Sequence, residues 1–407
     1  MESSRLSYLR TKMDAELGVS YIPNLIARQP KLFSPGMLQL ISKSERTFTR
    51  VDEHIGSSPY LECVRCTLLN LESLAAAIID GAEVDLLGLL MHDIKRDPDE
   101  DLSNVRVTTL TSQRAIQYRD YIETHNPCCD FSDFVFNKDS VMRIHEEINY
   151  PSDIKFRETY RGDGSRNPSR VHQRLPQNRT LPPDRIDEYM EDLFKFCNTD
   201  YYTPQIQAGL AHFQLEYIRP FKSRIDALGR HVSYIIYAKR QFTRNIIVSV
   251  AVESIRRVDD PVDPLKVSPE AAMKQSPLEL WIYHGANLLL READMVMDME
   301  RRYMSIEDEW RRKVLKVRKD DICDILLHDL LAHPIINARY VADRCDKTLP
   351  AANDALKKLV SAKVLAPVDT RKRNRYFYAV DVLDYYKSLL DLIIPQGWLP
   401  GTEMFNS

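Results

Sequence analysis

The sequence predicts a mainly α-helical protein: a helical bundle with a small β-hairpin flap, followed by a C-terminal winged helix-turn-helix unit. Apolar residues recur at helical spacing through most of the chain, and only 12 of the 407 residues are glycine. The pattern changes after Asp321, where shorter helical and β-prone runs begin. Because one hydrophobic core stops growing at roughly 250–300 residues, a chain of this length predicts more than one packed unit.

The composition is that of an ordinary folded protein, with 44% hydrophobic and 28% charged residues. A net charge of −3 and a pI near 6.4 exclude a protein that coats nucleic acid with its whole surface, and they confine any DNA contact to a local patch. The longest apolar run, Leu86–Met91, is far shorter than the ~20 residues of a membrane helix. We therefore expect a cytoplasmic protein without membrane contact.

The seven cysteines are odd in number and scattered, and no signal peptide is recognisable, so the sequence predicts free thiols in a reducing compartment. Cys63-Val-Arg-Cys66 is a CxxC pair without a second pair at zinc-ribbon spacing. Either the pair binds a metal or acts in redox chemistry, or the two thiols pack on one face of a helix. The second interpretation is favoured.

The first half of the chain predicts an N-terminal arm and several helices. Residues 1–55 contain a proline-punctuated opening and then a helical pattern that starts at Met37. A further helix is predicted from Ser57–Pro59 to Leu90, with a serine hydroxyl as N-cap and the proline at the first helical position. Helical spacing returns over 114–150. It is lost over 156–183, and within that stretch 156–160 and 171–175 predict the two arms of the exposed hairpin flap.

The second half begins with a helix over 184–196 that has acidic residues in its first turn. Helices over about 204–218 and 229–242 flank a polar loop, and 277–316 forms one or two long helices whose leucine and methionine stripe predicts core or a dimer seam. Three short helices and two β-prone runs between Asp321 and Tyr386 are typical of a winged helix.

We divide the chain into an arm (1–55), a bundle domain (56–316), a winged-helix domain (317–390) and a C-terminal tail (391–407). A homodimer is expected.

The most specific pattern is Ala211-His-Phe-Gln-Leu-Glu-Tyr-Ile-Arg-Pro-Phe221, followed by Gly229 and Arg230. Two more segments accompany it. They are Phe156-Arg157 and Leu181-Pro-Pro183 ahead of Met190–Leu193, and Ser58-Pro-Tyr-Leu-Glu62 with Thr67 and Leu68 behind it. In this order, and with a winged-helix-like tail, the segments resemble the Fic family.

The resemblance implies a Fic-type bundle and a known chemistry. In the family a histidine takes a proton from a protein hydroxyl, which attacks the α-phosphate of ATP and receives AMP. An acidic residue holds Mg²⁺, and glycine-rich backbone amides bind the phosphates. Such a reaction depends mainly on positioning and on neutralising charge. ATP and Mg²⁺ are therefore the implied cofactors, with a protein as the target.

The chain departs from the family pattern at several positions. Arg219 replaces the histidine, and a guanidinium cannot accept the proton. Loss of a positioned base costs on the order of 10²–10⁴ in rate. Three extra residues, 223–225, precede Asp226, which then matches the Mg²⁺ acid. Ala227 and Leu228 occupy the Gly-Asn positions, and Ser233 replaces a second phosphate-binding arginine.

The resemblance assigns Arg219 and Asp226 to the catalytic positions, with Asp226 as the metal ligand. The candidate nucleotide-binding residues are Lys222, Arg224, Ala227, Leu228, Gly229 and Arg230. The alternative is a solvated or salt-bridged basic loop. His212 and His231 are the nearest imidazoles, and we expect them to satisfy core hydrogen bonds rather than to replace the base.

Ser58 and Glu62 match the family's inhibitory helix, whose glutamate pairs with the second arginine. Since that arginine is Ser233 here, Glu62 either pairs with Arg219, Arg224 or Arg230, or has lost this role.

In the C-terminal unit, the segment from Thr348 would be the recognition helix and 371–375 the wing tip. The candidate DNA-binding residues are Asn353, Lys357, Lys358, Arg371, Lys372, Arg373 and Arg375. The alternative is a unit that only packs or pairs subunits.

Together these features predict a Fic-like protein with an eroded motif and little or no AMP transfer, acting by binding a nucleotide, a protein or DNA. One alternative is an active, divergent Fic nucleotidyltransferase that uses Asp226 with Mg²⁺. Another is a winged-helix transcriptional regulator whose Fic domain serves as sensor or dimerisation body.

Overall fold

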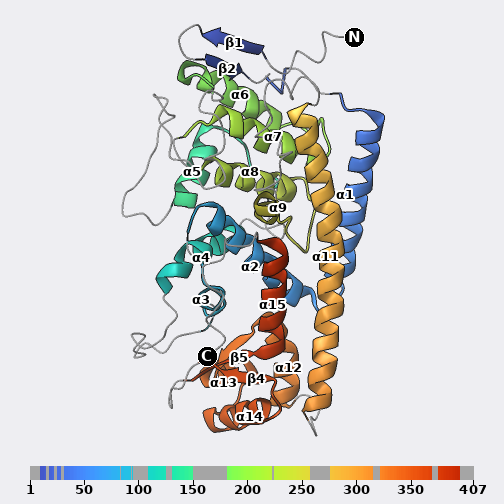
Figure 1. The fold of residues 1–407 in the computed structure, drawn as a ribbon, viewed down its shortest axis with the longest axis vertical. Helices are drawn as coiled ribbons and strands as arrows, with labels where there is room; N and C mark the ends of the chain where they lie inside the picture. The colour runs from blue at the N-terminus through green and yellow to red at the C-terminus, as the bar shows by residue number, and fades with distance from the viewer. Residues whose placement is uncertain are drawn as a thin grey trace.

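The fold is known from a computed structural model that describes residues 10–14, 18–22, 25–28, 32–82, 84–92, 94, 109–124, 131–149, 181–221, 224–256, 276–314, 321–368 and 375–394. The molecule is elongated, with the bundle above and the C-terminal unit below (Figure 1). It is mainly α-helical, as predicted. No described helix combines the length and apolarity that a bilayer crossing requires.

The N-terminal arm contains a hairpin that the sequence did not reveal. Strands β1 (Arg10–Asp14) and β2 (Gly18–Ile22) pair antiparallel, with Arg10 opposite Ile22. Helix α1 (Pro35–Gly56) follows, and the Ser34 hydroxyl caps it by accepting from the amide of Met37 at 3.2 Å. Along its length α1 lies beside α11 (Pro277–Lys313), the longest helix of the described chain (Figure 1). In the described part of the 277–316 pattern, residues 277–313 therefore form one continuous helix.

The rest of the described bundle consists of helices that are shorter than α1 and α11. They are α2 (Leu61–Ile79), α3 (Leu86–Leu90), α4 (Thr109–Thr124), α5 (Lys138–Asn149), the 3-10 turn η4 (Pro183–Arg185), α6 (Ile186–Cys197), α7 (Pro204–Ile218), α8 (Ile225–Lys239) and α9 (Val250–Arg256).

Two helix starts differ from the prediction. Helix α2 begins at Leu61, because residues 58–60 form a turn in which the Ser58 hydroxyl accepts from the amide of Tyr60 at 3.1 Å. It ends at Ile79, ahead of Gly81 with φ 82°, so the pattern to Leu90 is broken into two helices. Helix α8 begins four residues earlier than predicted. The predicted flap at 156–175 lies outside the described residues.

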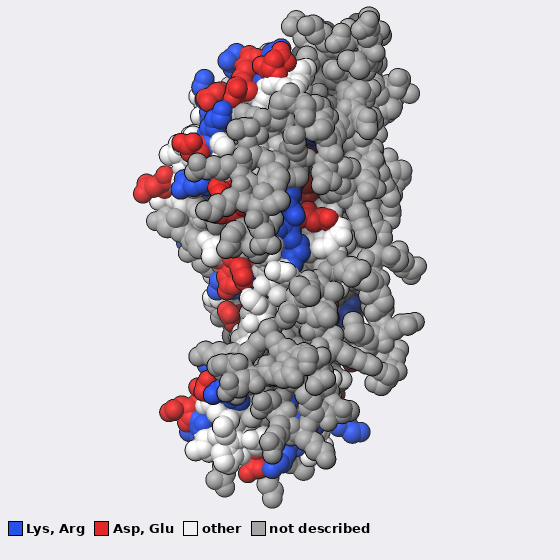
Figure 2. Space-filling view, turned by 90° about the vertical axis from the view of Figure 1, so that its left-hand side faces the viewer, with Lys and Arg blue, Asp and Glu red and all other residues white. Residues whose placement is uncertain are grey.

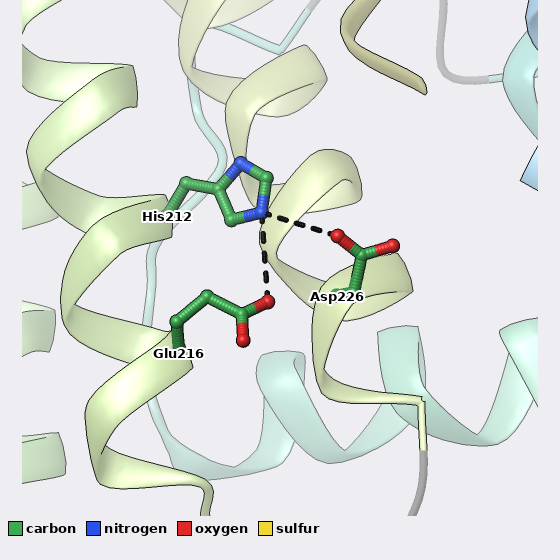
Figure 3. Close-up of side chains that lie close together, drawn as sticks. All are labelled: His212, Glu216 and Asp226. Carbon is green, nitrogen blue, oxygen red and sulfur yellow. Dashed lines mark ion pairs between the residues drawn. The ribbon is translucent and has the colours of Figure 1, made fainter. Parts of the chain in front are cut away.

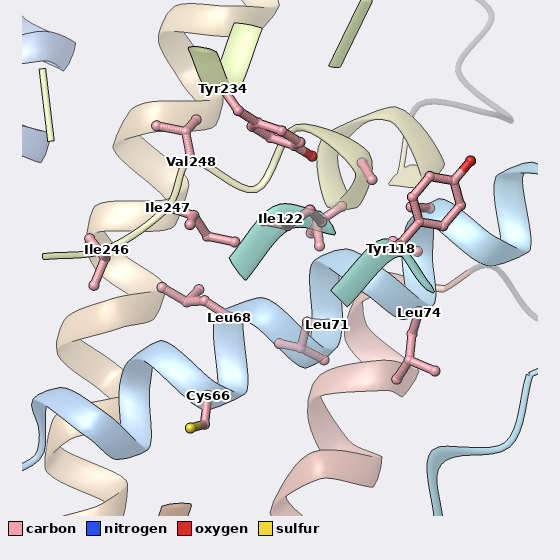
Figure 4. Packing of buried hydrophobic residues seen from close by; sticks show 14 of the residues in the cluster. Cys66, Leu68, Leu71, Leu74, Tyr118, Ile122, Tyr234, Ile246, Ile247 and Val248 are labelled. Carbon is pink, nitrogen blue, oxygen red and sulfur yellow. The ribbon is translucent and has the colours of Figure 1, made fainter. Parts of the chain in front are cut away.

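Helix α2 is at the centre of the core. Its side chains Leu68 and Leu71 lie among Ile122 of α4 and Ile246–Val248 of the segment before α9 (Figure 4). Cys63 and Cys66 are buried on the same helix, and burial raises the pKa of the Cys63 thiol to about 12. This supports packing thiols over a reactive pair.

Two buried carboxylates fix irregular backbone around this core. Glu72 accepts from the amides of Ala251 at 2.6 Å and Val252 at 3.1 Å, and so caps α9. Asp52 accepts from the amides of residues 244, 245 and 246 at 2.9–3.0 Å. A buried carboxylate that accepts several amide protons replaces the hydrogen bonds it would form in water.

The C-terminal unit has the predicted helices and β-runs plus one short strand. Its elements are α12 (Ile322–Ala332), β3 (Ile335–Asn337), α13 (Ala338–Cys345), α14 (Leu349–Ser361), β4 (Leu365–Pro367) and β5 (Tyr376–Ala379). The three strands form an antiparallel sheet in the order β3-β5-β4. The chain thus follows a helix-strand-helix-helix-strand-strand path.

Helix α15 (Val380–Ile393) was not predicted as an element, and the expected boundary at residue 390 falls inside it. It runs from β5 back toward the bundle (Figure 1). Asn70 of α2 donates to the hydroxyl of Tyr386 at 3.0 Å, and Trp310 of α11 donates to Asp381 at 2.6 Å. The C-terminal unit is therefore attached to the bundle through buried polar contacts as well as through the chain.

A histidine lies at this attachment. His328 of α12 has Nδ1 3.1 Å from a carboxylate oxygen of Glu307 and Nε2 3.1 Å from the carbonyl oxygen of Pro59. Both partners are acceptors, so only the imidazolium form can donate to both. The hydrogen bond to Glu307 raises the pKa of His328 above its ordinary value, although burial opposes the shift.

Because the folded-state pKa of His328 is raised, its contribution to stability is present below the ordinary pKa of 6.5 and is lost as the pH rises through the raised value. Solvent screening at a side chain that is 40% exposed limits the effect to about 1 kcal/mol. We expect urea unfolding at pH 5.5 and 8.5 to show a larger stability loss at high pH for the wild type than for His328→Gln. The matched control is His333→Gln on the segment after α12, which should keep the wild-type difference. Equal pH dependence in all three proteins would contradict the assignment.

Candidate functional site

The predicted motif lies where α7 passes into α8. Helix α7 ends at Ile218, and the cap residue Arg219 adopts a left-handed conformation with φ 47°. Arg224, ahead of α8, is also left-handed, with φ 56°. This conformation is strained for any residue other than glycine or asparagine, by about 1–2 kcal/mol. The chain therefore reverses through two strained arginines, which surrounding contacts hold in place.

Helices α7 and α8 pack closely because one of the contact positions is a glycine. A Cβ atom on Gly229 would lie 2.1 Å from Cδ2 of His212, a distance that no real contact permits. The edge of the imidazole thus lies against the α8 backbone, while the ring of Trp281 from α11 meets it at a centroid distance of 5.1 Å. His212 is 2% exposed.

Three buried side chains converge at this crossing: His212 and Glu216, one helical turn apart on α7, and Asp226 in the first turn of α8 (Figure 3). Nε2 of His212 lies 3.9 Å from Oε1 of Glu216 and 3.8 Å from Oδ1 of Asp226. The three candidate ligand atoms all lie within 4.8 Å of one another.

Arg219 folds back on the helix that it terminates. Its Nε donates to the carbonyl oxygen of Glu216 at 2.9 Å, and a terminal nitrogen lies 3.6 Å from Oε2 of the same residue. The side chain is buried. Burial lowers the pKa of the guanidinium, and Glu216 partly offsets this. Arg219 acts here as a helix cap and as a counter-ion to Glu216.

Arg230 forms a similar ion pair with Asp226, the predicted metal ligand. Its guanidinium forms an ion pair with Oδ2 of Asp226, one turn earlier on α8, and lies 5.8 Å from the ring centroid of Tyr118. Arg230 is 0% exposed. A guanidinium this deeply buried neutralises internal carboxylates and does not face solvent.

The residues expected to form the phosphate cradle lie inside α8. Ala227, Leu228 and Arg230 are fully buried, and the amide of Leu228 donates to the carbonyl of Arg224 at 2.9 Å, which closes the first helical turn. Only the first amides of a helix remain open to an anion. The hydroxyl of Ser233 donates to the carbonyl of Gly229 at 3.0 Å. The structure thus does not present the amides of 228–230 to a phosphate, and Lys222 lies outside the described residues.

Arg224 has an acidic partner, but it is Asp80 and not Glu62. Asp80 accepts from Arg224, from Nε of Arg114 at 3.2 Å and from the hydroxyl of Tyr118 at 2.5 Å. Burial alone would raise the pKa of Asp80, but Arg224 and Arg114 bring it below its ordinary value.

Glu62 lies at the other end of α2, a helix about 28 Å long. It is 60% exposed there and pairs with Arg65 at 3.9 Å. Of the two alternatives for Glu62, this position favours the loss of the inhibitory role over pairing with one of the loop arginines.

A cavity of about 40 Å³ borders His212. Gln205, Ser233, Glu253 and Trp281 are among the residues that line it. Such a volume accommodates about three water molecules, not a nucleotide.

The family's Mg²⁺ does not fit Asp226 as it stands. Mg²⁺ requires near-octahedral oxygen ligands and retains several waters. Asp226 is 6% exposed, with one oxygen on Arg230 and the other facing an imidazole. A hydrated ion carrying ATP phosphates therefore has no place at this carboxylate.

The sequence pointed to Arg219, Asp226 and Arg230, but not to what surrounds them. Asp80 and Arg114 come from distant segments and carry no motif. The only sequence signal for the cluster of His212, Glu216 and Asp226 is the His-x-x-x-Glu spacing on α7.

In the C-terminal unit, Asn353 and Lys357 are exposed on α14, Lys358 is half-buried, and Lys357 pairs with Asp354 at 2.9 Å. Arg375 lies 5.0 Å from the ring centroid of Phe377. Arg371, Lys372 and Arg373 lie outside the described residues. Figure 2 shows acidic and basic side chains interspersed at the lower end of the molecule, where this unit lies.

No family model matches this chain, and no curated protein matches it. Among solved structures, the chain is similar to a Fic family protein from Desulfovibrio desulfuricans G20. The two are 13% identical, the match covers 86% of this chain and 97% of that chain, and the TM-score is 0.43. The resemblance to the Fic family thus still rests on the motifs in the sequence.

The role of Gly229 can be tested by a double-mutant cycle. Gly→Ala inside a helix normally stabilises by about 1 kcal/mol, but here the methyl group meets His212 and overpacking costs typically about 1–3 kcal/mol or more. We expect Gly229→Ala to lower the free energy of unfolding in urea. In a His212→Ala background the same change should be neutral or stabilising. A stabilising Gly229→Ala in the wild type would contradict the close packing.

Proposed function

We propose that this chain is a Fic-like protein that no longer transfers AMP and that acts by binding a protein or DNA. The observation that carries the proposal is the internal ion pair between Asp226 and Arg230, the two charges with which the reaction would bind Mg²⁺ and phosphate. Arg219, at the position of the family's base, pairs in turn with Glu216. In the described part of the site, an arginine stands at the position of the base, the expected cradle residues lie inside α8, and the Mg²⁺ acid is paired with Arg230, so the positioning and charge stabilisation on which phosphoryl-type transfer depends are missing there.

The proposal predicts no AMP transfer by the full chain. With α-labelled ATP, Mg²⁺ or Mn²⁺ and a cell lysate, we expect no more label on the chain or on lysate proteins than with the isosteric variant Asp226→Asn. Arg219→His should also remain inactive, because the base alone does not rebuild the cradle. Label that depends on Asp226 would overturn the proposal and favour a divergent transferase.

A second candidate function, nucleic-acid binding, is supported by the order of elements in the C-terminal unit. The three helices, with the short strand β3 after the first, precede the antiparallel strands β4 and β5, an order typical of a winged helix. Helix α14, the predicted recognition helix, carries exposed Asn353 and Lys357. The exposed pair between Lys357 and Asp354 is weak, so the lysine remains available to a phosphate. The mixed surface charge predicts modest affinity that relies on the wing residues.

DNA binding should fall in the triple variant Arg371→Ala, Arg373→Ala, Arg375→Ala. We expect the slope of log K against log salt to decrease by about 1 for each phosphate that the variant no longer binds. The matched control replaces three exposed arginines of α11, Arg301, Arg302 and Arg312, and should bind like the wild type. Fluorescence anisotropy with duplex DNA at several salt concentrations measures both. If the wing variant binds as well as the control, the wing does not contact DNA.

A further inference from the structure

We propose that His212, Glu216 and Asp226 form a buried site for one divalent transition-metal ion of the Zn²⁺ or Co²⁺ type. The three side chains come from two helices and point toward a common centre (Figure 3). They supply one imidazole nitrogen and two carboxylate oxygens, a ligand set that such ions accept. The inference does not depend on the loss of AMP transfer.

The distances fit an ion after a small contraction. A metal about 2.0–2.2 Å from each ligand atom in tetrahedral geometry separates the ligand atoms by about 3.4 Å. The separations here are 3.9 Å from His212 to Glu216 and 3.8 Å from His212 to Asp226. The oxygens of Glu216 and Asp226 lie within 4.8 Å of each other, so side-chain shifts of up to roughly 1 Å would close the site. Water or a small anion would take the fourth position.

A shared proton explains this arrangement less well than a metal does. An imidazolium that bridged two carboxylates would form N–H···O bonds of about 2.7–2.9 Å. Both separations are roughly 1 Å longer than that. Nε2 of His212 is too far from either carboxylate oxygen for a strong hydrogen bond, but the three atoms are close enough together to be ligands of one ion.

The two arginines orient the carboxylates from outside. Arg219 approaches Oε2 of Glu216 and Arg230 approaches Oδ2 of Asp226, while Oε1 and Oδ1 face His212. Each carboxylate thus has one oxygen on a guanidinium and the other turned to the centre. Outer partners of this kind fix ligands in protein metal sites, and their loss typically weakens metal binding by about 10–100-fold.

The same arginines decide which metal is bound. They offset the negative charge of the carboxylates, which disfavours Mg²⁺ and Ca²⁺, ions that bind through charge and oxygen ligands. An ion that gains from the imidazole nitrogen is less affected, and affinity for such sites rises from Mn²⁺ toward the later transition metals. The site therefore favours Zn²⁺ or Co²⁺ over Mg²⁺, in contrast to the ion that the Fic resemblance implies.

Metal binding by the full chain tests the proposal. Protein stripped with a chelator should take up about one equivalent of Zn²⁺ in competition with a metal-sensitive dye, and an excess of Mg²⁺ should not displace it. Co²⁺ should give visible d–d bands without the near-ultraviolet thiolate bands that cysteine ligands produce. No tight uptake of Zn²⁺, or thiolate bands with Co²⁺, would overturn the site.

Near-isosteric variants locate the ion. We expect His212→Gln, Glu216→Gln and Asp226→Asn each to weaken Zn²⁺ binding by at least about 100-fold, more than an outer-partner variant would. His231→Gln is the matched control, because His231 is also a buried imidazole on α8 but binds the carbonyl of Ala227. Binding that is unchanged in all three ligand variants, or lost in the control alone, would place the ion elsewhere and overturn the site. The measurements on the wild type keep the proposal testable if a variant does not fold.

Discussion

The candidate site depends on the close approach of α7 and α8, which Gly229 permits by leaving room for the imidazole of His212. A Cβ atom at that position would collide with the imidazole, so either His212 or α8 would have to move. Either shift would move His212 and Asp226 relative to each other. The present arrangement of the histidine and the two acids thus requires a glycine at 229. Close packing transmits such a change because the interior has little free volume.

Charge pairing explains how so many ionisable groups are tolerated in this core. Three buried carboxylates near the α7–α8 loop have guanidinium partners: Glu216 has Arg219, Asp226 has Arg230, and Asp80 has Arg224 together with Arg114. An unpaired buried charge is strongly destabilising, whereas a paired one approaches neutrality. The arginines that resemble remnants of a phosphate site therefore have a structural use in this core.

The C-terminal unit is not an independent appendage. Helix α11 extends from Trp281, beside His212, to Trp310, which contacts Asp381 at the start of α15. Helix α15 then returns to α2, where Tyr386 accepts from Asn70. Helices α11 and α15 thus fix the position of the C-terminal unit on the bundle. Any nucleic acid or partner that the unit binds is therefore positioned relative to the bundle. The homodimer expected from the sequence stays a prediction.

The sequence by itself determined the helical class, most helix positions, and the three helices and two later strands of the C-terminal unit, because apolar spacing and capping residues are local signals. It also singled out Arg219, which stands where the resemblance to the Fic family leads one to expect a histidine. Only the tertiary structure decided that α8 begins at Ile225, since Asp226-Ala-Leu-Gly229 suits a helix as well as a loop. Only the tertiary structure brought Asp80 to Arg224 and left Glu62 at the far end of α2, because these pairings join distant segments that share no motif.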